Sequence, residues 1–284
     1  MKKLLSFFLA LTLVMPLGAI ELPGFEWEAG ADVTSSYLWR GLKLGGLALQ
    51  PDVNVGFGGL KLEAWANVSP TDYTFSELMP ELDLTLSYSI VGLTIGVTHQ
   101  YYFDGSKYFD YRMPSVADYE GENYGVGYAG NQTEIFAKYE LGEVLDFLPL
   151  TLMWSTYVGG DDWLPLYEDA VDPDKITGLK RAYSSYIELS YDAELPLGFT
   201  LSPTVGFTPW ASMYNYYDGG FSLNNLSVKL NWEKELGNHV CLDVYAIGML
   251  NTSGINKSNM LPGIANSYNN QRLNSAIGLG LWFY

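Results

Sequence analysis

Apolar and polar side chains alternate one by one along most of this chain, and the alternation recurs in segment after segment. In the segment 272–284, Leu273 and Leu279 fall on one face and Asn274 and Gly278 on the other. A period of two is the pattern of a β-strand and not of a helix. Although 48% of the residues are hydrophobic, no stretch beyond residue 19 offers the ~18 consecutive apolar residues of a membrane-spanning helix. We therefore predict an all-β protein.

The alternating segments predict twelve strands, and the connections between them alternate in length. Connections after even-numbered strands are short, such as 58–59, whereas those after odd-numbered strands include 104–130 and 159–181. Short turns at one end and long loops at the other are typical of a transmembrane antiparallel up-and-down β-barrel with both termini in the periplasm. The expected strands are 27–41, 48–57, 60–68, 81–90, 93–103, 131–140, 148–158, 182–193, 199–209, 221–233, 239–251 and 272–284.

The first nineteen residues have the features of a secretory signal peptide. Lys2 and Lys3 precede an apolar run over 4–14, and Gly18-Ala19 provides a small-residue cleavage site. We expect cleavage after Ala19, which leaves 20–284 as a single barrel domain in the outer membrane of a Gram-negative bacterium. The aromatic-ended segment 272–284 resembles the closing strand of such barrels, and we expect the barrel-assembly machinery to recognise it.

Composition narrows the range of partners. Aromatic residues make up 15% of the chain, and their rings gather at the predicted strand ends, where membrane barrels carry aromatic girdles. We therefore expect contacts with outer-membrane lipid and lipopolysaccharide; the alternative is a Tyr-rich soluble sandwich. A net charge of −17 argues against nucleic-acid binding, which needs Lys and Arg for the phosphates. With one Cys and two His, we expect no disulfide, no zinc site of the usual kind and no cofactor.

The polar face of the strands predicts a charged lumen in which acids outnumber bases. Carboxylates that line a narrow pore attract cations. We therefore predict a narrow, weakly cation-preferring channel for the passive diffusion of small solutes or ions. The candidate pore-lining residues are Asp32, Arg40, Asp52, Lys61, Glu63, Asp83, Glu134, Lys138, Glu188, Lys229 and Asp243, with Arg40 near the outer mouth.

Two other functions fit the same pattern. Opposite charges could pair across strands, for instance Lys61 with Asp52, and fill the lumen of a surface or binding barrel. Alternatively, the barrel could be a lipid-modifying enzyme with His99 on its lipid-facing side, although the sequence shows no nucleophile beside that histidine. We expect no enzymatic activity, with His99 an anchor at the interface. The six acids of 159–181 lack the spacing of a Ca²⁺ loop and predict an acidic surface loop.

One stretch of the chain carries a family resemblance. Tyr37-Leu38-Trp39-Arg40-Gly41 is followed by Pro51, by a Gly-containing hairpin at 56–59 and by Ala64-Trp65-Ala66-Asn67-Val68. Over about residues 30–68 this order resembles the N-terminal region of the TorF-like porin family. The segment 42–45 departs from the polar stretch that the family has there. The resemblance implies an outer-membrane porin of unspecified substrate, and it transfers no solute-binding residues.

Overall fold

A computed structural model describes residues 24–70, 78–103, 108–109, 111–116, 131–168, 172–215, 220–252 and 272–284. The predicted signal peptide lies outside the described residues, as does most of the loop 104–130. No helix among these residues is long and apolar enough to cross a bilayer.

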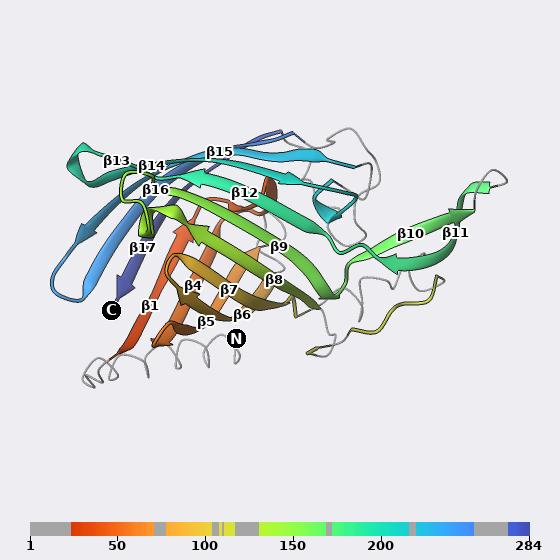
Figure 1. Ribbon diagram of the computed structural model, residues 1–284, viewed down its shortest axis with the longest axis horizontal. Coiled ribbons are helices and arrows are strands. Elements are labelled where there is room, and N and C mark those ends of the chain that lie inside the picture. The colour runs from red at the N-terminus through yellow and green to blue at the C-terminus, as the bar shows by residue number, and fades with distance from the viewer. Residues whose placement is uncertain are drawn as a thin grey trace.

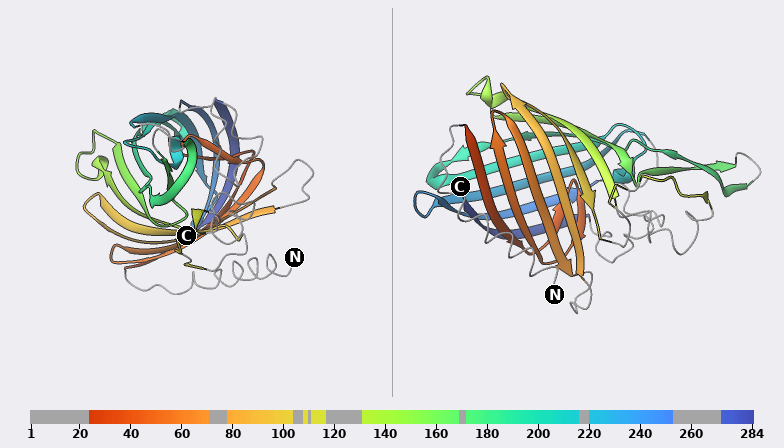
Figure 2. Two further views of the ribbon diagram at one scale, coloured as in Figure 1. Left: turned by 90° about the vertical axis from the view of Figure 1, so that its right-hand side faces the viewer. Right: turned by 90° about the horizontal axis from the view of Figure 1, so that it is seen from below.

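Twelve strands form one closed antiparallel barrel, which confirms the predicted fold class (Figures 1 and 2). The barrel closes because the first strand pairs with the last, and each remaining strand pairs with its neighbours on both sides. In order around the wall, the strands are β1 (Phe25–Thr34), β4 (Ala48–Phe57), β5 (Leu60–Pro70), β6 (Leu78–Ile90), β7 (Leu93–Tyr101), β8 (Asn131–Glu140), β9 (Leu150–Gly160), β12 (Ser185–Tyr191), β14 (Phe199–Thr208), β15 (Ser222–Glu235), β16 (Val240–Asn251) and β17 (Leu273–Phe283).

The other elements are short and lie at the ends of the barrel. Strand β13 (Ala193–Leu195) continues β12 along the edge of β14. Strands β2 (Tyr37–Trp39) and β3 (Leu42–Gly45) form one separate hairpin, and β10 (Trp163–Glu168) and β11 (Asp172–Arg181) form another that projects away from the barrel (Figure 1). The described residues also include three single turns of 3-10 helix: η2 (Leu141–Glu143), η3 (Pro196–Gly198) and η4 (Met213–Asn215).

The two ends of the barrel differ, as the connection lengths predicted. One end, called here the short-turn end, carries the connections 58–59 and 91–92 together with the start of β1 and the end of β17. The opposite long-loop end carries the β2–β3 hairpin, the β10–β11 hairpin and η4. The turn at Gly58-Gly59 has positive φ at both residues, as tight β-hairpins require.

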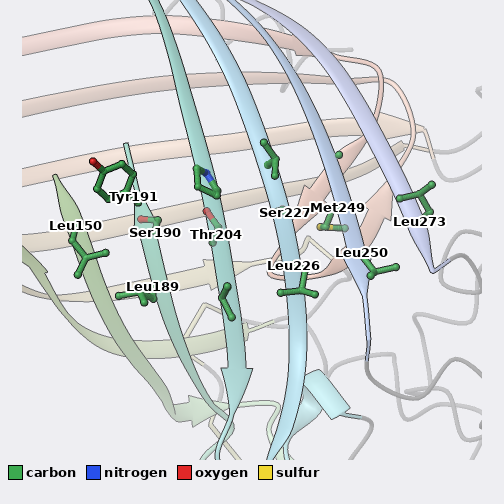
Figure 3. Close-up of a pocket in the computed structure, with 14 residues that line it drawn as sticks. Leu150, Leu189, Ser190, Tyr191, Thr204, Leu226, Ser227, Met249, Leu250 and Leu273 are labelled. Carbon is green, nitrogen blue, oxygen red and sulfur yellow. The ribbon is translucent and has the colours of Figure 1, made fainter. Parts of the chain in front are cut away.

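The wall has an apolar outer face and a more polar inner face. On β17, the outward Leu273, Ile277 and Leu279 are 72%, 67% and 51% exposed, whereas the inward Asn274 and Ala276 are 5% and 4% exposed. A groove of about 470 Å³ lies on this outer surface, and leucines of several neighbouring strands lie side by side there (Figure 3). The core of the molecule therefore lies inside the barrel, and its apolar surface lies outside.

Two predicted segments fold differently from expectation. Strand 27–41 ends at Thr34, and residues 35–47 fold back as the β2–β3 hairpin. Tyr37 and Trp39, which belong to the predicted strand 27–41, consequently lie inside the barrel, where Tyr37 is buried and Trp39 packs against buried residues. The reason is local: Arg40 and Gly41 have φ values of 46° and 86°, and two such residues make a tight hairpin turn. The predicted loop 159–181 likewise contains the β10–β11 hairpin.

Candidate functional site

The lumen of the barrel has two halves that differ in how far their side chains are exposed. At the long-loop end, the inward side chains of Asn67, Tyr157 and Tyr186 are completely buried. Toward the short-turn end, the inward side chains of Lys61 and Lys138 are 42% and 38% exposed. Inward side chains of the wall are thus covered by other residues at the long-loop end and are partly exposed at the short-turn end.

Residues 35–47, called here the lumen hairpin, fill the buried half. The hairpin leaves the wall after β1, and its side chains contact both β5 and β8. The Tyr37 ring lies 5.7 Å from that of Trp65 on β5. At the tip, a Cβ atom on Gly41 would lie 2.5 Å from the carbonyl oxygen of Asn224 on β15, so only glycine fits there. The hairpin therefore extends across the lumen and contacts opposite parts of the wall.

Arg40 at the tip of the lumen hairpin forms a bidentate ion pair with Glu134 on β8. The distances are 2.5 Å from Nη1 to Oε2 and 2.7 Å from Nη2 to Oε1, and Nη1 also donates to the Tyr214 hydroxyl at 2.6 Å. The two charged side chains are only 12% and 6% exposed. Paired N–H···O bonds to a carboxylate are the strongest side-chain contacts that arginine makes. This pair fixes the hairpin tip to a strand far around the barrel.

Aromatic rings surround this ion pair. The Arg40 guanidinium carbon lies 4.6 Å from the centre of the Trp39 ring and 5.1 Å from that of Tyr186, distances at which a cation is attracted to a ring face. Tyr214 belongs to η4, which also folds into the barrel, and its ring lies 5.2 Å from that of Tyr186. A buried cluster results, formed by Leu42, Tyr157, Tyr186, Met213 and Tyr214 with Trp39, Leu44 and Met153 packed against it.

The predicted lumen bases beyond Arg40 lie in the open half. Lys61 pairs with Glu63 at 2.9 Å, and Lys138 pairs with Glu140 at 3.0 Å, each with a residue two positions further along its own strand. The suggested pairing of Lys61 with Asp52 is therefore wrong, because Glu63 lies on the same face of the same strand and is closer. Lys229 lies 4.7 Å from the centre of the Tyr245 ring.

The predicted lumen acids have different surroundings. Glu134 is the only one among the described residues that pairs with Arg40. Asp83 accepts a 3.3 Å bond from Gln100, and Glu188 accepts a 2.8 Å bond from Tyr186. Asp32 on β1 and Asp243 on β16 both align with Gly280 of β17, which lies between them. Asp52 lies on β4 beside Asn54, which donates to it over 3.5 Å.

The sequence missed the aromatic partners of Arg40. Tyr157 and Tyr186 lie on the inward face of their strands, which is otherwise mostly polar. A large ring at such a position was the one feature of the sequence that could have indicated a contact inside the lumen. Tyr214 lay in a predicted connection and offered no such signal. Below the hairpin, a cavity of about 370 Å³ remains, lined by Trp39, Arg40, Met153, Glu188, Ser227 and Lys229 among others.

His99 lies on the outer face of β7 and is enclosed there. Its Nδ1 atom is 2.9 Å from the hydroxyl of Thr133, and the ring of Phe109 stacks on the imidazole at 4.2 Å. The Tyr111 hydroxyl also reaches Thr133, at 2.7 Å. Tyr108, Phe109 and Tyr111 thus pack against the outside of the wall, and they cover the histidine.

Acidic side chains near the long-loop end have structural partners. Asp162 is fully buried and accepts bonds from the backbone N–H and the hydroxyl of Ser184, at 2.9 and 2.5 Å. It therefore holds the base of the β10–β11 hairpin. In the part of the chain that the structure describes, no three His, Cys, Asp or Glu side chains are arranged to hold a metal ion.

Comparisons with known proteins add little to this geometry. No family model matches the chain, and no curated protein matches it. The chain is similar to the KdgM porin (6% identity, 91% of this chain and 98% of that chain, TM-score 0.41). It is also similar to the NanC porin (9% identity, 91% and 100%, TM-score 0.42) and to Salmonella typhi OmpF (8% identity, 93% and 99%, TM-score 0.38). At these TM-scores, the similarities do not bear on what this chain does.

Proposed function

We propose that the chain is an outer-membrane channel of the porin type, which passes small solutes or ions by passive diffusion. The observation that carries this proposal is the two-faced wall. Large exposed apolar patches are rare on soluble monomers, whereas the outer face of β17 presents Leu273, Ile277 and Leu279 to the surroundings. A lipid-facing apolar band around a polar interior is the design of transmembrane barrels. The resemblance of residues 30–68 to the TorF-like porins supports the same function.

The orientation follows from the connections. Bacterial barrels place short turns in the periplasm and long loops outside. In that orientation the chain termini face the periplasm, and the lumen hairpin lies toward the outer mouth. The long loops would then contact lipopolysaccharide, and β17 would be the strand that the barrel-assembly machinery engages after export by the signal peptide 1–19.

The lumen charges favour a weak preference for cations. Arg40, Lys61 and Lys138 are each paired with a carboxylate, so their charges are largely compensated. Asp32 and Asp243, in contrast, form no ion pair among the described residues and share one nearby cation, Lys229, which leaves one of the two charges uncompensated. Uncompensated carboxylates along a narrow pore lower the energy of a cation and raise that of an anion.

Planar-bilayer recordings of the refolded mature protein across a KCl gradient test this proposal. We expect discrete steps with a reversal potential on the cation-selective side. Asp32→Asn combined with Asp243→Asn should move that potential toward zero. Asp146→Asn, in an exposed short-turn connection outside the wall, should leave it unchanged.

Two results would count against the channel. An unchanged potential in the double variant would refute the role of the acidic lumen. A correctly folded barrel that never conducts would instead favour the second candidate, a filled-lumen surface or binding barrel, which the buried long-loop half of the lumen supports. We propose no lipid-modifying role for His99, because Phe109 and Thr133 occupy its surroundings.

A further inference from the structure

We propose that the lumen hairpin is a displaceable stopper, and that the contact of Arg40 with Glu134 and Tyr214 is the latch that holds it across the lumen. This inference rests on the proposed channel function and adds to it a closed state with a defined release point. Four observations carry it.

First, the lumen hairpin is not part of the barrel wall. Strands β2 and β3 pair with each other and with no wall strand. The pairing of β1 with β4 runs through Thr34 opposite Ala48, the residues on either side of the hairpin. A bond from the Ser35 N–H to the Ile277 carbonyl anchors only its base. The hairpin can therefore move without breaking a hydrogen bond of the wall ladders.

Second, the position of the hairpin depends on side-chain contacts. An isolated two-stranded hairpin is at best marginally stable in water, so contacts with its surroundings must hold this one in place. At the tip, Arg40 makes three hydrogen bonds, and nearer the base Tyr37 interacts with the buried Glu81 of β6. Loss of the Arg40 bonds would free the end of the hairpin that lies furthest from its attachment to the wall.

Third, part of the wall behind the hairpin is polar, beside the aromatic patch of Tyr157 and Tyr186 that packs with Leu42. A permanently filled core is normally apolar, because buried polar groups must each find a hydrogen-bond partner. Here the hairpin covers Ser69, against which Gly45 packs, and Asn225, which lies beside Gly41. Both side chains are at most 4% exposed. The buried Oδ1 atom of Asn225 accepts no hydrogen bond from the described residues. Such a wall suits a lumen that fills with water when the hairpin leaves.

Fourth, the open half of the lumen reaches the underside of the hairpin. The cavity of about 370 Å³ is lined both by Trp39 and Arg40 of the hairpin and by Lys229 of the wall. Displacement of the hairpin would therefore join an existing cavity to the long-loop end. The tip of the hairpin thus forms part of the boundary of this cavity.

The test compares single-channel currents of three variants with those of the unaltered mature chain. The first replaces residues 35–47 with Asn-Gly, a two-residue turn suited to the Thr34–Ala48 pair. The second, Glu134→Gln, keeps the shape of the side chain and removes the charge that pairs with Arg40. The third, Glu140→Gln, is the matched control, because it breaks an exposed ion pair on the same strand. Far-UV circular dichroism and heat-dependent gel mobility establish that each barrel has folded.

We expect the hairpin-free barrel to stay in a state of larger conductance that the unaltered chain visits rarely. Loss of one partner of a buried ion pair should raise the ratio of open to closed time by about 100-fold or more in Glu134→Gln. Glu140→Gln should match the unaltered chain, since exposed pairs contribute little.

The possible failures are distinguishable. Equal conductance in the hairpin-free and unaltered barrels would overturn the stopper while leaving the channel intact. An open hairpin-free barrel with an unaltered opening ratio in Glu134→Gln would overturn the latch. If the hairpin-free barrel folds and still passes no current, the stopper is overturned, because η4 then closes the lumen without the hairpin.

Discussion

The sharpest prediction concerns Gly41 at the tip of the lumen hairpin. Gly41→Ala adds a single methyl group, changes no charge and leaves Arg40, Glu134 and Tyr214 in place. The substitution therefore tests whether the hairpin must fit tightly against the wall, independently of the ion pair. If the hairpin blocks the lumen, this one methyl group should favour its release.

The magnitude follows from the geometry. Gly41 has a φ of 86°, and left-handed backbone costs a residue with a Cβ atom about 1–2 kcal/mol. The new Cβ would lie 2.5 Å from the Asn224 carbonyl oxygen, a backbone atom that side-chain rotation cannot move aside. The conformational cost alone should shift the equilibrium from the seated hairpin toward the displaced hairpin about 5–30-fold, and the close contact with Asn224 should increase this shift.

Single-channel recording measures this change as the fraction of time spent in the larger conductance state. Gly58→Ala is the matched control, because Gly58 has a φ of 58° in a short turn and nothing lies within 4 Å of its would-be Cβ. It carries a similar backbone cost but does not touch the hairpin. If Gly41→Ala behaved like Gly58→Ala, the claim of a tightly seated hairpin would be refuted.

Two further predictions concern the latch and the wall. Tyr214→Phe removes one of the three hydrogen bonds of Arg40, and a bond to a charged group is worth about 1.5–3 kcal/mol. This variant should therefore raise the open fraction in single-channel records less than Glu134→Gln does. A larger effect of Tyr214→Phe would contradict this order. Leu279→Arg, on the outer face of β17, should lower the unfolding free energy in lipid vesicles by about 2–4 kcal/mol, whereas Leu197→Arg in a short turn should cost about 0–1 kcal/mol. Equal costs in urea titrations would contradict the lipid-facing position.

The sequence predicted the wall because each wall strand has one apolar and one polar face. As a result, apolar and polar residues alternate with a period of two along the sequence, as in β17. The sequence did not predict the lumen hairpin, because its strands have the same period of two as the wall strands. Tyr37 and Trp39 therefore continued the alternation of β1. The local signal was Arg40-Gly41, a pair suited to a two-residue turn, and it was too short to outweigh the pattern.

The alternation along each strand also assigned the candidate charged residues to the polar face, but it could not predict which residues they contact. Arg40 and Glu134 are 94 residues apart, and they meet only because the hairpin crosses the lumen. Lys61 meets Glu63 rather than Asp52 because two positions along one strand bring side chains close on the same face. Contacts across a barrel depend on the path of the hairpin and on strand stagger, which local sequence does not specify.

The central claim is that the lumen hairpin seals the long-loop half of the lumen, and thiol labelling tests it most directly. Cys241 faces the open half and is partly exposed, so it should react readily with a membrane-impermeant maleimide in the folded barrel. Ser69→Cys, in a Cys241→Ser background, should react slowly, because Ser69 is 1% exposed behind the hairpin. Replacing residues 35–47 with Asn-Gly should make it react as fast as Cys241. Rapid labelling of Ser69→Cys with the hairpin in place would contradict the sealed lumen.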